Sequence, residues 1–369
     1  MNVKVDEWGP EKIVIVNNKR IGLKGFLVID NTAAGPGKGG IRMVPDVTLE
    51  EVARLARAMT WKNAMAGLPF GGAKAGIVAN PHAMTKDKKM KLIRAFAKAL
   101  KNLTPAEYIA GPDMNTGKVE MAIFADENGV DSCTGKPSEM GGLPHELGST
   151  GWGVYQATIT ALKFLKMKVK RTTVAIEGFG NVGTFTAKFL SKAGARIVAV
   201  SDSKGTIYNP RGLDIDKLIK IKEEKKTVTK YGGGKILKNS QLFGLKVDVL
   251  IPGARPDSIN EKNYNDVKAK LLVEAANIPI PLDIEEKLWK KKITIIPDFV
   301  ANAGGVISSY VESIHGTENQ MFKMVEEKIT ANTELVLKKA KELKISQRLA
   351  ALKIAQHRVH RAMNYRVGL

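Results

Sequence analysis

Apolar residues in the first half of the chain follow two different periods. Short alternating stretches predict strands, whereas apolar residues repeated every three or four positions predict amphipathic helices. One helix begins at a capping box formed by Thr48 and Glu51, and it ends at Gly67. Glycines gather in two segments, GPGKGGIR and LPFGGAKAGI, which we expect to be loops. The first half is therefore predicted to be α/β, with strands at 12–18 and 25–30, helices at 48–67 and 86–103, and further strands ending near Ala79 and within AEYIAGPDMNT.

The second half contains apolar runs without alternation. These runs are TTVAIE, ARIVAVSD, VDVLIP, AKLLVEAAN and ITIIPD, separated by helices and loops. Continuous apolar strands joined by crossovers are typical of a parallel sheet covered by helices on both faces. We therefore expect an α/β protein of two domains, the first over residues 1–148 and a doubly wound, Rossmann-type dinucleotide-binding domain over 149–334. The helices of residues 335–369 are expected to pack back near the first domain.

Composition excludes several classes of protein. The 369 residues are 44% hydrophobic and 26% charged, which are values of globular proteins and not of disordered chains. No apolar stretch approaches the ~18–20 residues of a membrane span, and the start MNVKVDEWGPEK lacks the apolar run of a signal peptide. A single cysteine, Cys133, excludes an internal disulfide and a thiolate zinc site. We expect a soluble, cytoplasmic protein with no metal and no membrane partner.

The net charge of +21 raises the question of a polyanionic partner. Nine lysines lie in residues 217–246 and nine basic residues in 338–366, at helical spacings beside glutamates. This pattern is typical of solvated helix faces. The chain has no RNA-binding aromatic signature and no zinc-finger spacing, so nucleic-acid binding is not the expected function.

A dinucleotide fingerprint follows the strand TTVAIE. Gly178, Gly180 and Gly183 fit G-x-G-x-x-G, and the motif also contains Phe179, Asn181 and Val182. These glycines allow a tight turn, close approach of the pyrophosphate and close packing of the helix, whose N-terminus attracts phosphate. Asp202 ends the next strand, where an acid that binds the ribose is expected, and Ser203 and Lys204 could tolerate a 2′-phosphate. The cofactor is predicted to be NAD or NADP.

Three lysines of the first half suggest an anionic substrate. Lys62 lies on the same helix stripe as Val52, Leu55, Met59 and Ala66, and an inward lysine is costly unless it meets an anion. Lys38 and Lys74 lie in the two glycine segments, where a ligand can approach the backbone. Converging ammonium groups would lower one lysine pKa towards neutrality and create a general acid or base. Each lysine alone could instead extend to solvent, and Asp113, the candidate proton carrier, could be a turn residue.

The chain resembles the glutamate/leucine/phenylalanine/valine dehydrogenases, and it is most similar to the archaeal type of glutamate dehydrogenase. The resemblance runs from about Phe26 to the C-terminus. It rests on GKGGIR, MTWKNA, LPFGGAKAGI, GPDMNT, GFGNVG, VAVSDSKGTIYNPRGLD, EAAN and PDFVANAGGVISSYVE, in this order. The resemblance implies that the first domain binds substrate and forms oligomers, and that the reaction is reversible oxidative deamination of an L-amino acid to a 2-oxoacid and ammonia.

The resemblance also implies roles for single residues by motif position. Lys74 would be catalytic and activate water, Asp113 would carry protons, and Lys62 would hold the α-carboxylate. Lys38 would pair with a side-chain carboxylate, assisted by Ser309. Asn302 is expected near substrate and nicotinamide, whereas Thr150, Asn181 and Asn277 would contact the cofactor.

The polar pair Lys38 and Ser309 makes L-glutamate the expected substrate. Relatives that act on branched or aromatic amino acids have apolar residues there, because a buried cation without a carboxylate is penalised. A branched-chain (leucine or valine) dehydrogenase and a non-catalytic relative that binds nucleotides or nucleic acid are the alternatives. The family implies a homo-oligomer, with a hexamer as the leading expectation. Hydride transfer also predicts closure of the domains about a hinge within 141–153.

Overall fold

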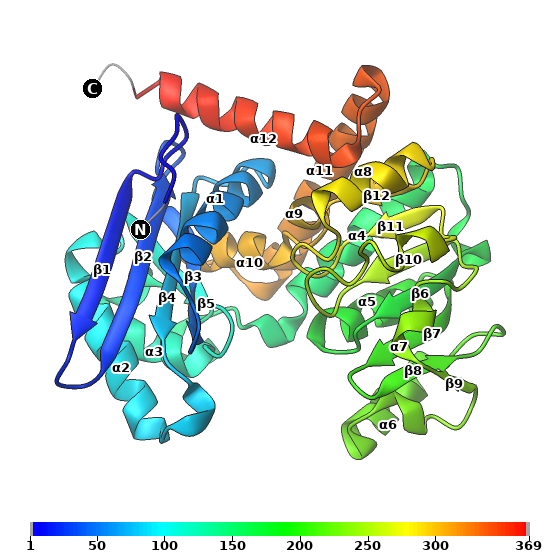
Figure 1. Ribbon diagram of the computed structural model, residues 1–369, viewed down its shortest axis with the longest axis horizontal. Coiled ribbons are helices and arrows are strands. Elements are labelled where there is room, and N and C mark those ends of the chain that lie inside the picture. Colours follow the sequence, from blue (N-terminus) through cyan, green and yellow to red (C-terminus); the bar gives the residue numbers. More distant parts are fainter. Residues whose placement is uncertain (1–2, 367–369) are drawn as a thin grey trace. The chain divides into compact units, whose positions relative to one another are not determined.

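The computed structural model describes residues 3–366 of the chain, which form two compact units (Figure 1). Of the described residues, unit 1 comprises 3–147, 306–321 and 354–366, and unit 2 comprises 148–305 and 322–353. The division after residue 147 lies one residue from the expected boundary. The C-terminal part differs from expectation, because 306–321 belongs to unit 1 and 335–353 to unit 2. Residues 1, 2 and 367–369 of the expected ranges lie outside the described part.

Unit 1 is built on a five-stranded mixed sheet. Its strands are β1 (Lys12–Asn18), β2 (Leu23–Asn31), β3 (Gly37–Val44), β4 (Gly71–Val78) and β5 (Tyr108–Pro112), in the order β1-β2-β4-β3-β5. Strand β2 is antiparallel to β1 and β4, whereas β3 is parallel to β4 and β5. Strand β1 therefore forms one edge of the sheet.

The two glycine segments are strands and not the loops that we expected. They form most of β3 and β4. These two strands pair with each other in parallel, and Lys38 of β3 lies opposite Gly72 of β4. Glycine is needed here because neighbouring backbone lies where a side chain would be. A Cβ on Gly72 would lie 2.1 Å from Thr60 Oγ1, and a Cβ on Gly39 would lie 1.7 Å from Ala73 O. The glycines thus let backbone pack against backbone. Because glycine adds no apolar side chain to the pattern, the sequence of such a strand resembles that of a loop.

Helices cover both faces of this sheet. Helix α1 (Leu49–Met65) packs on one face with Phe26 and Val28 of β2. Helices α2 (Lys86–Ala99) and α3 (Lys118–Asn128) pack on the other, where Phe96 and Phe124 join the core residues Ile41, Met43 and Ile77. Because side chains alternate along a strand, the even-numbered residues of β3 and β4 face α1.

The buried face of α1 differs from the predicted stripe. Its buried residues are Leu49, Val52, Ala56, Thr60, Asn63, Ala64 and Met65, whereas Leu55, Met59 and Lys62 are half-buried. Thr48 caps the helix by accepting a hydrogen bond from Glu51 N at 3.1 Å, as expected. The Glu51 carboxylate, however, pairs with Arg42 at 2.6 Å. Polar residues therefore occupy the inward face, which the apolar pattern did not reveal.

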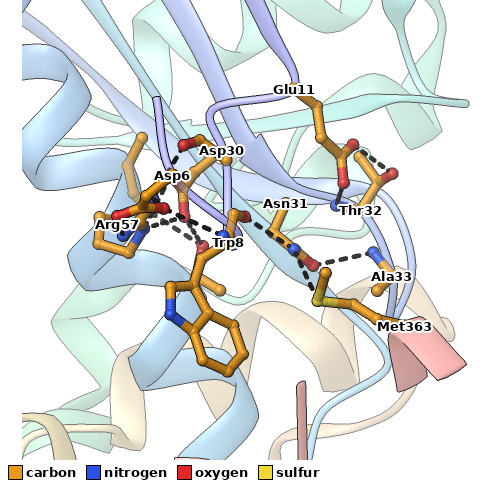
Figure 2. Close-up of polar contacts among 12 residues, drawn as sticks. Asp6, Trp8, Glu11, Asp30, Asn31, Thr32, Ala33, Arg57 and Met363 are labelled. Carbon is orange, nitrogen blue, oxygen red and sulfur yellow. Dashed lines mark hydrogen bonds and ion pairs between the residues drawn. The ribbon is translucent and has the colours of Figure 1, made fainter. Parts of the chain in front are cut away.

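A polar cluster fixes the N-terminal segment and α1 to strand β2 (Figure 2). Arg57 of α1 pairs with the buried Asp30 of β2 at 2.9 Å and with Asp6 at 2.7 Å. Thr60 donates to the same Asp30 at 2.5 Å. Asn31 donates to Trp8 O at 2.9 Å and contacts the sulfur of Met363 in the C-terminal helix. Since Arg57 and Thr60 of α1 both bond to Asp30 of β2, they set the position of the helix over the glycine strands.

Unit 2 contains a seven-stranded sheet in the order β12-β11-β10-β6-β7-β8-β9. Five neighbouring strands are parallel as expected, namely β6 (Thr173–Glu177), β7 (Arg196–Asp202), β10 (Val249–Pro252), β11 (Leu271–Val273) and β12 (Thr294–Ile296). Two further strands, β8 (Gly205–Tyr208) and β9 (Lys235–Leu237), extend the sheet antiparallel and were not predicted.

Helices lie on both faces of the second sheet. Ala175 packs in the core formed with α7 (Asn239–Leu242) and α8 (Leu282–Lys290), whereas the next residue, Ile176, points towards Gly183 of α5 (Asn181–Lys192). Adjacent strand residues face opposite sides, so α5 covers the other face. The remaining helices are α4 (Ser149–Phe164), α6 (Ile215–Lys225), α9 (Asp298–Ala301), α10 (Gly304–Ser313), α11 (Glu318–Leu343) and α12 (Gln347–Asn364).

Short 3-10 helices complete the connections. They span Pro81–Ala83, Lys101–Leu103, Val130–Ser132, Ser138–Met140, His145–Leu147, Val169–Arg171, Val228–Lys230 and Tyr264–Asp266. Within residues 3–366, none of the helices combines the length and the apolar character that crossing a bilayer requires.

Substitution of Gly72 tests how closely α1 packs on the sheet. In Gly72→Ala the new methyl would meet the backbone of Thr60, since the Cβ position lies 2.3 Å from Thr60 N. We expect a loss of about 1–3 kcal/mol in the free energy of unfolding, measured by urea denaturation. Gly117→Ala is the matched control, because its Cβ would make an ordinary contact at 3.7 Å with Glu120. Equal stabilities of the two variants would contradict this packing.

Candidate functional site

Strands β3 and β4 place three cationic side chains on the face of the sheet that α1 covers. Lys38 and Arg42 are four residues apart on β3 and point to the same side, as do even-numbered residues of β4, including Lys74. The carboxylate of Asp113, directly after β5, joins two of them: Oδ2 lies 2.9 Å from Lys74 Nζ and 2.9 Å from Arg42 Nε. This cluster contains both predicted catalytic residues.

The charge state of Asp113 follows from these neighbours. Burial raises the pKa of Asp113, but the ammonium of Lys74 and the guanidinium of Arg42 outweigh burial and hold the pKa below its usual value. Asp113 is therefore an ionised carboxylate that can accept a proton. It is positioned by Thr116, whose hydroxyl accepts from Asp113 N at 2.9 Å and donates to Ile41 O at 2.6 Å.

Lys38 is buried, and its ammonium forms no ion pair with a carboxylate among residues 3–366. Its side chain is nearly inaccessible, and Nζ donates to Ala110 O at 2.5 Å and to Ile109 O at 3.4 Å. Burial lowers the pKa of Lys38 to about 7, helped by the ammonium groups of Lys136 and Lys74 and partly offset by Glu312. The lysine whose pKa falls towards neutrality, as expected for one member of the set, is thus Lys38.

A second polar atom lies beside the Lys38 ammonium. The Cβ position of Gly111 is 2.9 Å from Lys38 Nζ and 3.9 Å from Thr134 Oγ1. Thr134 is 1% exposed, and its hydroxyl has no hydrogen-bond partner among the described residues. Because Gly111 has no side chain, an ammonium and an unpaired hydroxyl converge on one point. Such a pair can bind a carboxylate oxygen.

A buried ion pair holds the segment that carries Thr134. Lys136 Nζ lies 2.6 Å from Glu312 Oε1 of α10 and donates to Cys133 O at 2.7 Å. The other carboxylate oxygen of Glu312 accepts from Gly135 N at 2.9 Å and from Leu143 N at 2.8 Å. Helix α10 therefore fixes residues 133–143 next to the Lys38 cluster.

The other two predicted substrate residues of unit 1 are half-buried. Lys62 is half-buried in the last turn of α1, and Ser309 is half-buried one turn before Glu312 on α10. The structure brings Lys38, Lys74 and Asp113 together. A meeting of Lys62 or Ser309 with that cluster remains a prediction.

The glycine fingerprint of unit 2 forms the predicted turn between β6 and α5. Gly178 has φ +89°, and a Cβ on Gly183 would lie 1.9 Å from Gly178 O, so both glycines are required. A Cβ on Gly180 would meet nothing within 4 Å, so this position is open to approach from outside. Gly180 also begins α5 without a side-chain cap. Gly180 and Asn181 are both exposed, so a phosphate can approach the N-terminus of α5, and the loop fits a dinucleotide.

Asp202 ends β7 as predicted, but its carboxylate is occupied by protein groups. Four donors surround it: Lys222 Nζ at 2.7 Å, Val228 N at 2.8 Å, Lys204 N at 2.9 Å and Thr227 Oγ1 at 3.3 Å. Burial raises the pKa of Asp202, but Lys222 and the backbone donors outweigh it and lower the pKa. A carboxylate accepts about four hydrogen bonds, so little capacity remains for a ribose hydroxyl. Ser203 and Lys204 beside it are exposed.

The predicted amides of unit 2 lie beside each other. Asn302 caps α9 and donates from Nδ2 to Ala276 O at 3.1 Å and to Asn277 Oδ1 at 3.2 Å. Its own Oδ1 is buried with no partner among the described residues. Asn277 is exposed, and Thr150 is half-buried in the first turn of α4. The free acceptor of Asn302 suits an amide or ammonium donor of a ligand.

Sequence reasoning missed Arg42, Thr134, Lys136, Glu312 and Lys222. The sequence could have identified Arg42 as a site residue, because a strand over this segment would place Arg42 on the same face as Lys38. The others act through contacts between segments far apart in the chain, which spacing does not reveal. Among residues 3–366, no group of three or more histidine, cysteine, aspartate or glutamate side chains is arranged to hold a metal ion.

Comparisons with known proteins identify the family of the chain. Residues 141–367 match the family model described as glutamate/leucine/phenylalanine/valine dehydrogenase, and residues 10–129 match the dimerisation domain of the same family. The chain is 41% identical to a glutamate dehydrogenase of Aeropyrum pernix over 91% of its length and 85% of the relative. It is 40% identical to an NADP-specific glutamate dehydrogenase of Saccharolobus shibatae, covering 91% of this chain and 83% of that one.

A solved structure gives the same result at the level of the fold. The hetero-hexameric glutamate dehydrogenase of Thermus thermophilus, determined with leucine bound, is 28% identical and superimposes with a TM-score of 0.87. The match covers 97% of this chain and 90% of that chain. The chain belongs to the glutamate/leucine/phenylalanine/valine dehydrogenase family.

Proposed function

We propose that this dehydrogenase catalyses the reversible, NAD(P)-dependent oxidative deamination of L-glutamate to 2-oxoglutarate and ammonia. The observation that carries the substrate assignment is the pair of Lys38 Nζ and Thr134 Oγ1 around the Cβ position of Gly111. A buried ammonium beside an unpaired hydroxyl is costly until an anion arrives. The distal carboxylate of glutamate supplies that anion, whereas the side chains of leucine and valine bring no anion to the ammonium and leave the hydroxyl unpaired. The curated relatives at 40–41% identity are glutamate dehydrogenases, which supports the same choice.

The remaining groups of unit 1 act at the other end of the substrate. Lys62 holds the α-carboxylate, which leaves the α-amino group for the Lys74 and Asp113 pair. Asp113 is ionised and accepts a proton from the substrate ammonium. The α-carbon then gives up its hydride, for which a bound nicotinamide would be the acceptor, and an imino carbon remains. Lys74 orients and activates the water that attacks this carbon, and the water releases one proton. The proton held by Asp113 returns to the nitrogen, and cleavage of the C–N bond with loss of the hydroxyl proton frees ammonia and leaves the 2-oxoacid.

The charge balance around Asp202 bears on the choice between NAD and NADP. Lys222 pairs with Asp202 at 2.7 Å, so the carboxylate that would repel a 2′-phosphate is neutralised. Ser203 and Lys204 are exposed next to it and offer a hydroxyl and a cation. We propose that NADP is accepted at least as well as NAD. The relative from Saccharolobus shibatae is NADP-specific, which supports this proposal.

Assembly and location complete the proposal. Strand β1 is the edge of its sheet, and it exposes Ile13 and Ile15 at 39% and 47%. An apolar edge strand is a common site of association between copies. We propose a homo-oligomer, with a hexamer as first choice because the Thermus thermophilus relative is hexameric. We also propose a cytoplasmic location.

Lys74 and Asp113 are both present and paired, which argues against a non-catalytic relative that binds nucleic acid.

Substitution of Lys74 tests the chemical assignment. In Lys74→Met the group that activates water is lost, so we expect kcat for 2-oxoglutarate, ammonia and NADPH to fall about a thousandfold, with coenzyme binding retained. Lys101→Met, an exposed lysine of the same unit, is the control and should keep full activity. Retained turnover in Lys74→Met would show that this lysine is not the catalytic group. If the wild type acts on leucine and not on glutamate, the proposal that L-glutamate is the substrate is wrong.

Substitution of Lys222 tests the coenzyme assignment. In Lys222→Met the Asp202 charge is no longer offset, so the carboxylate repels a 2′-phosphate. We expect KM for NADPH to rise about tenfold and KM for NADH to change much less. Lys225→Met removes an exposed lysine from the same helix and should leave both values unchanged. Parallel changes for NADH and NADPH in Lys222→Met would contradict the proposed role.

A further inference from the structure

A strained residue follows Asn277. Ile278 has φ +49°, which lies in the left-handed region that β-branched side chains rarely adopt. Strain of this kind persists only where surrounding contacts hold the backbone, and it occurs most often at functional sites. The contacts that hold Ile278 therefore also fix the direction of its neighbour Asn277.

The carboxylate of Asp298 provides that contact. Ile278 N donates to Asp298 Oδ2 at 2.8 Å, and the other oxygen, Oδ1, accepts from Arg348 Nη1 at 2.8 Å. Asp298 is also the first residue of α9, and Asn302 N donates to Asp298 O at 2.8 Å one turn later. One side chain thus connects Arg348 to the backbone beside Asn277 and to the helix that ends at Asn302.

Arg348 of α12 is the centre of a buried acidic cluster. Its guanidinium donates to Glu274 Oε2 at 2.6 Å and from Nε to Glu285 Oε1 at 2.8 Å, in addition to Asp298. Glu274 is fully buried, and its Oε2 also accepts from Asp298 N at 2.8 Å. Burial raises the pKa of Glu274 well above its usual value, and the neighbouring Glu285 adds to this effect. One guanidinium thus bonds to three acidic side chains inside the fold.

The geometry of this cluster depends on Arg348. Without the guanidinium, Glu274, Glu285 and Asp298 would lose the cation that they share. Asp298 would lose the hydrogen bond from Arg348 Nη1 to Oδ1, and its hold on Ile278 N would weaken. The strain at Ile278 would then relax, and Asn277 would change direction.

We propose that Arg348 is a positioning residue of the coenzyme site, which acts through Asp298 to hold Ile278 left-handed and so aims Asn277 and Asn302. The inference rests on the proposed function, because it takes these two amides as groups that contact coenzyme or substrate. Arg348 itself lies behind them, bonded to acidic side chains and packed 5.4 Å from the ring centre of Phe299. It contributes to binding by fixing other residues.

The test is a double-mutant cycle on the full-length chain, with NADPH and NADH as probes and their fluorescence as the readout. In Arg348→Met we expect the Kd for NADPH to rise about tenfold. Glycine adopts φ +49° without strain, so in an Ile278→Gly background the same Arg348→Met change should alter Kd less than about twofold. Arg361→Met, an exposed arginine of the same helix, is the control and should leave Kd unchanged.

A purely structural role of Arg348 gives a different result. It would lower the thermal unfolding midpoint and change Kd equally, or not at all, in the two backgrounds, and either outcome overturns the inference. If Arg348→Met does not fold, Arg348→Lys is put through the same cycle, since lysine keeps the charge but loses the forked geometry. Asn277→Ala separates the inference from the proposed function. Weaker NADPH binding in Asn277→Ala with an unchanged Kd in Arg348→Met overturns only the inference, whereas unchanged binding in Asn277→Ala removes the coenzyme assignment and the inference with it.

Discussion

The burial of two lysines on one face of a sheet is the constraint on which the candidate site depends. An ammonium that leaves water needs a compensating anion or loses its proton. Lys74 has its anion in Asp113, whereas Lys38 has backbone carbonyls and a pKa of about 7. One lysine is therefore held in an ion pair, and the other reaches its charged state most readily when an anion binds. This difference separates a chemical role for Lys74 from a selective role for Lys38.

The backbone makes this arrangement possible. Glycines in β3 and β4 bring strand against strand and α1 against the sheet, with Gly72 beneath Thr60. The bonds of Arg57 and Thr60 to Asp30 then fix α1 in place. Unit 2 is arranged in a similar way. Its buried cation, Arg348, bonds to Asp298, which holds the backbone beside Asn277. In both units a charge inside the fold determines the direction of groups at the site.

The sequence predicted a large part of this picture for physical reasons. Continuous apolar strands identified the parallel sheet of unit 2, and the fingerprint at Gly178 identified the turn into α5, because both are local patterns. The prediction of loops for the two glycine segments was wrong, because glycine has no side chain to show a period. The occupied carboxylate of Asp202, the ion pair of Lys136 with Glu312 and the cluster of Arg348 depend on contacts between distant segments. Only the folded chain brings these residues together.

The most direct test of the account is a measurement of proton uptake when substrate binds. Calorimetric titration of 2-oxoglutarate with saturating NADP, at pH 8 and in two buffers of different ionisation enthalpy, reports the protons taken up. Because the pKa of Lys38 is about 7 in the free protein and a second carboxylate favours its charged form, wild type should take up about one proton more than Lys38→Met. Equal proton uptake by the two proteins, or binding of a 2-oxoacid without a second carboxylate as tight as that of 2-oxoglutarate, would contradict the account.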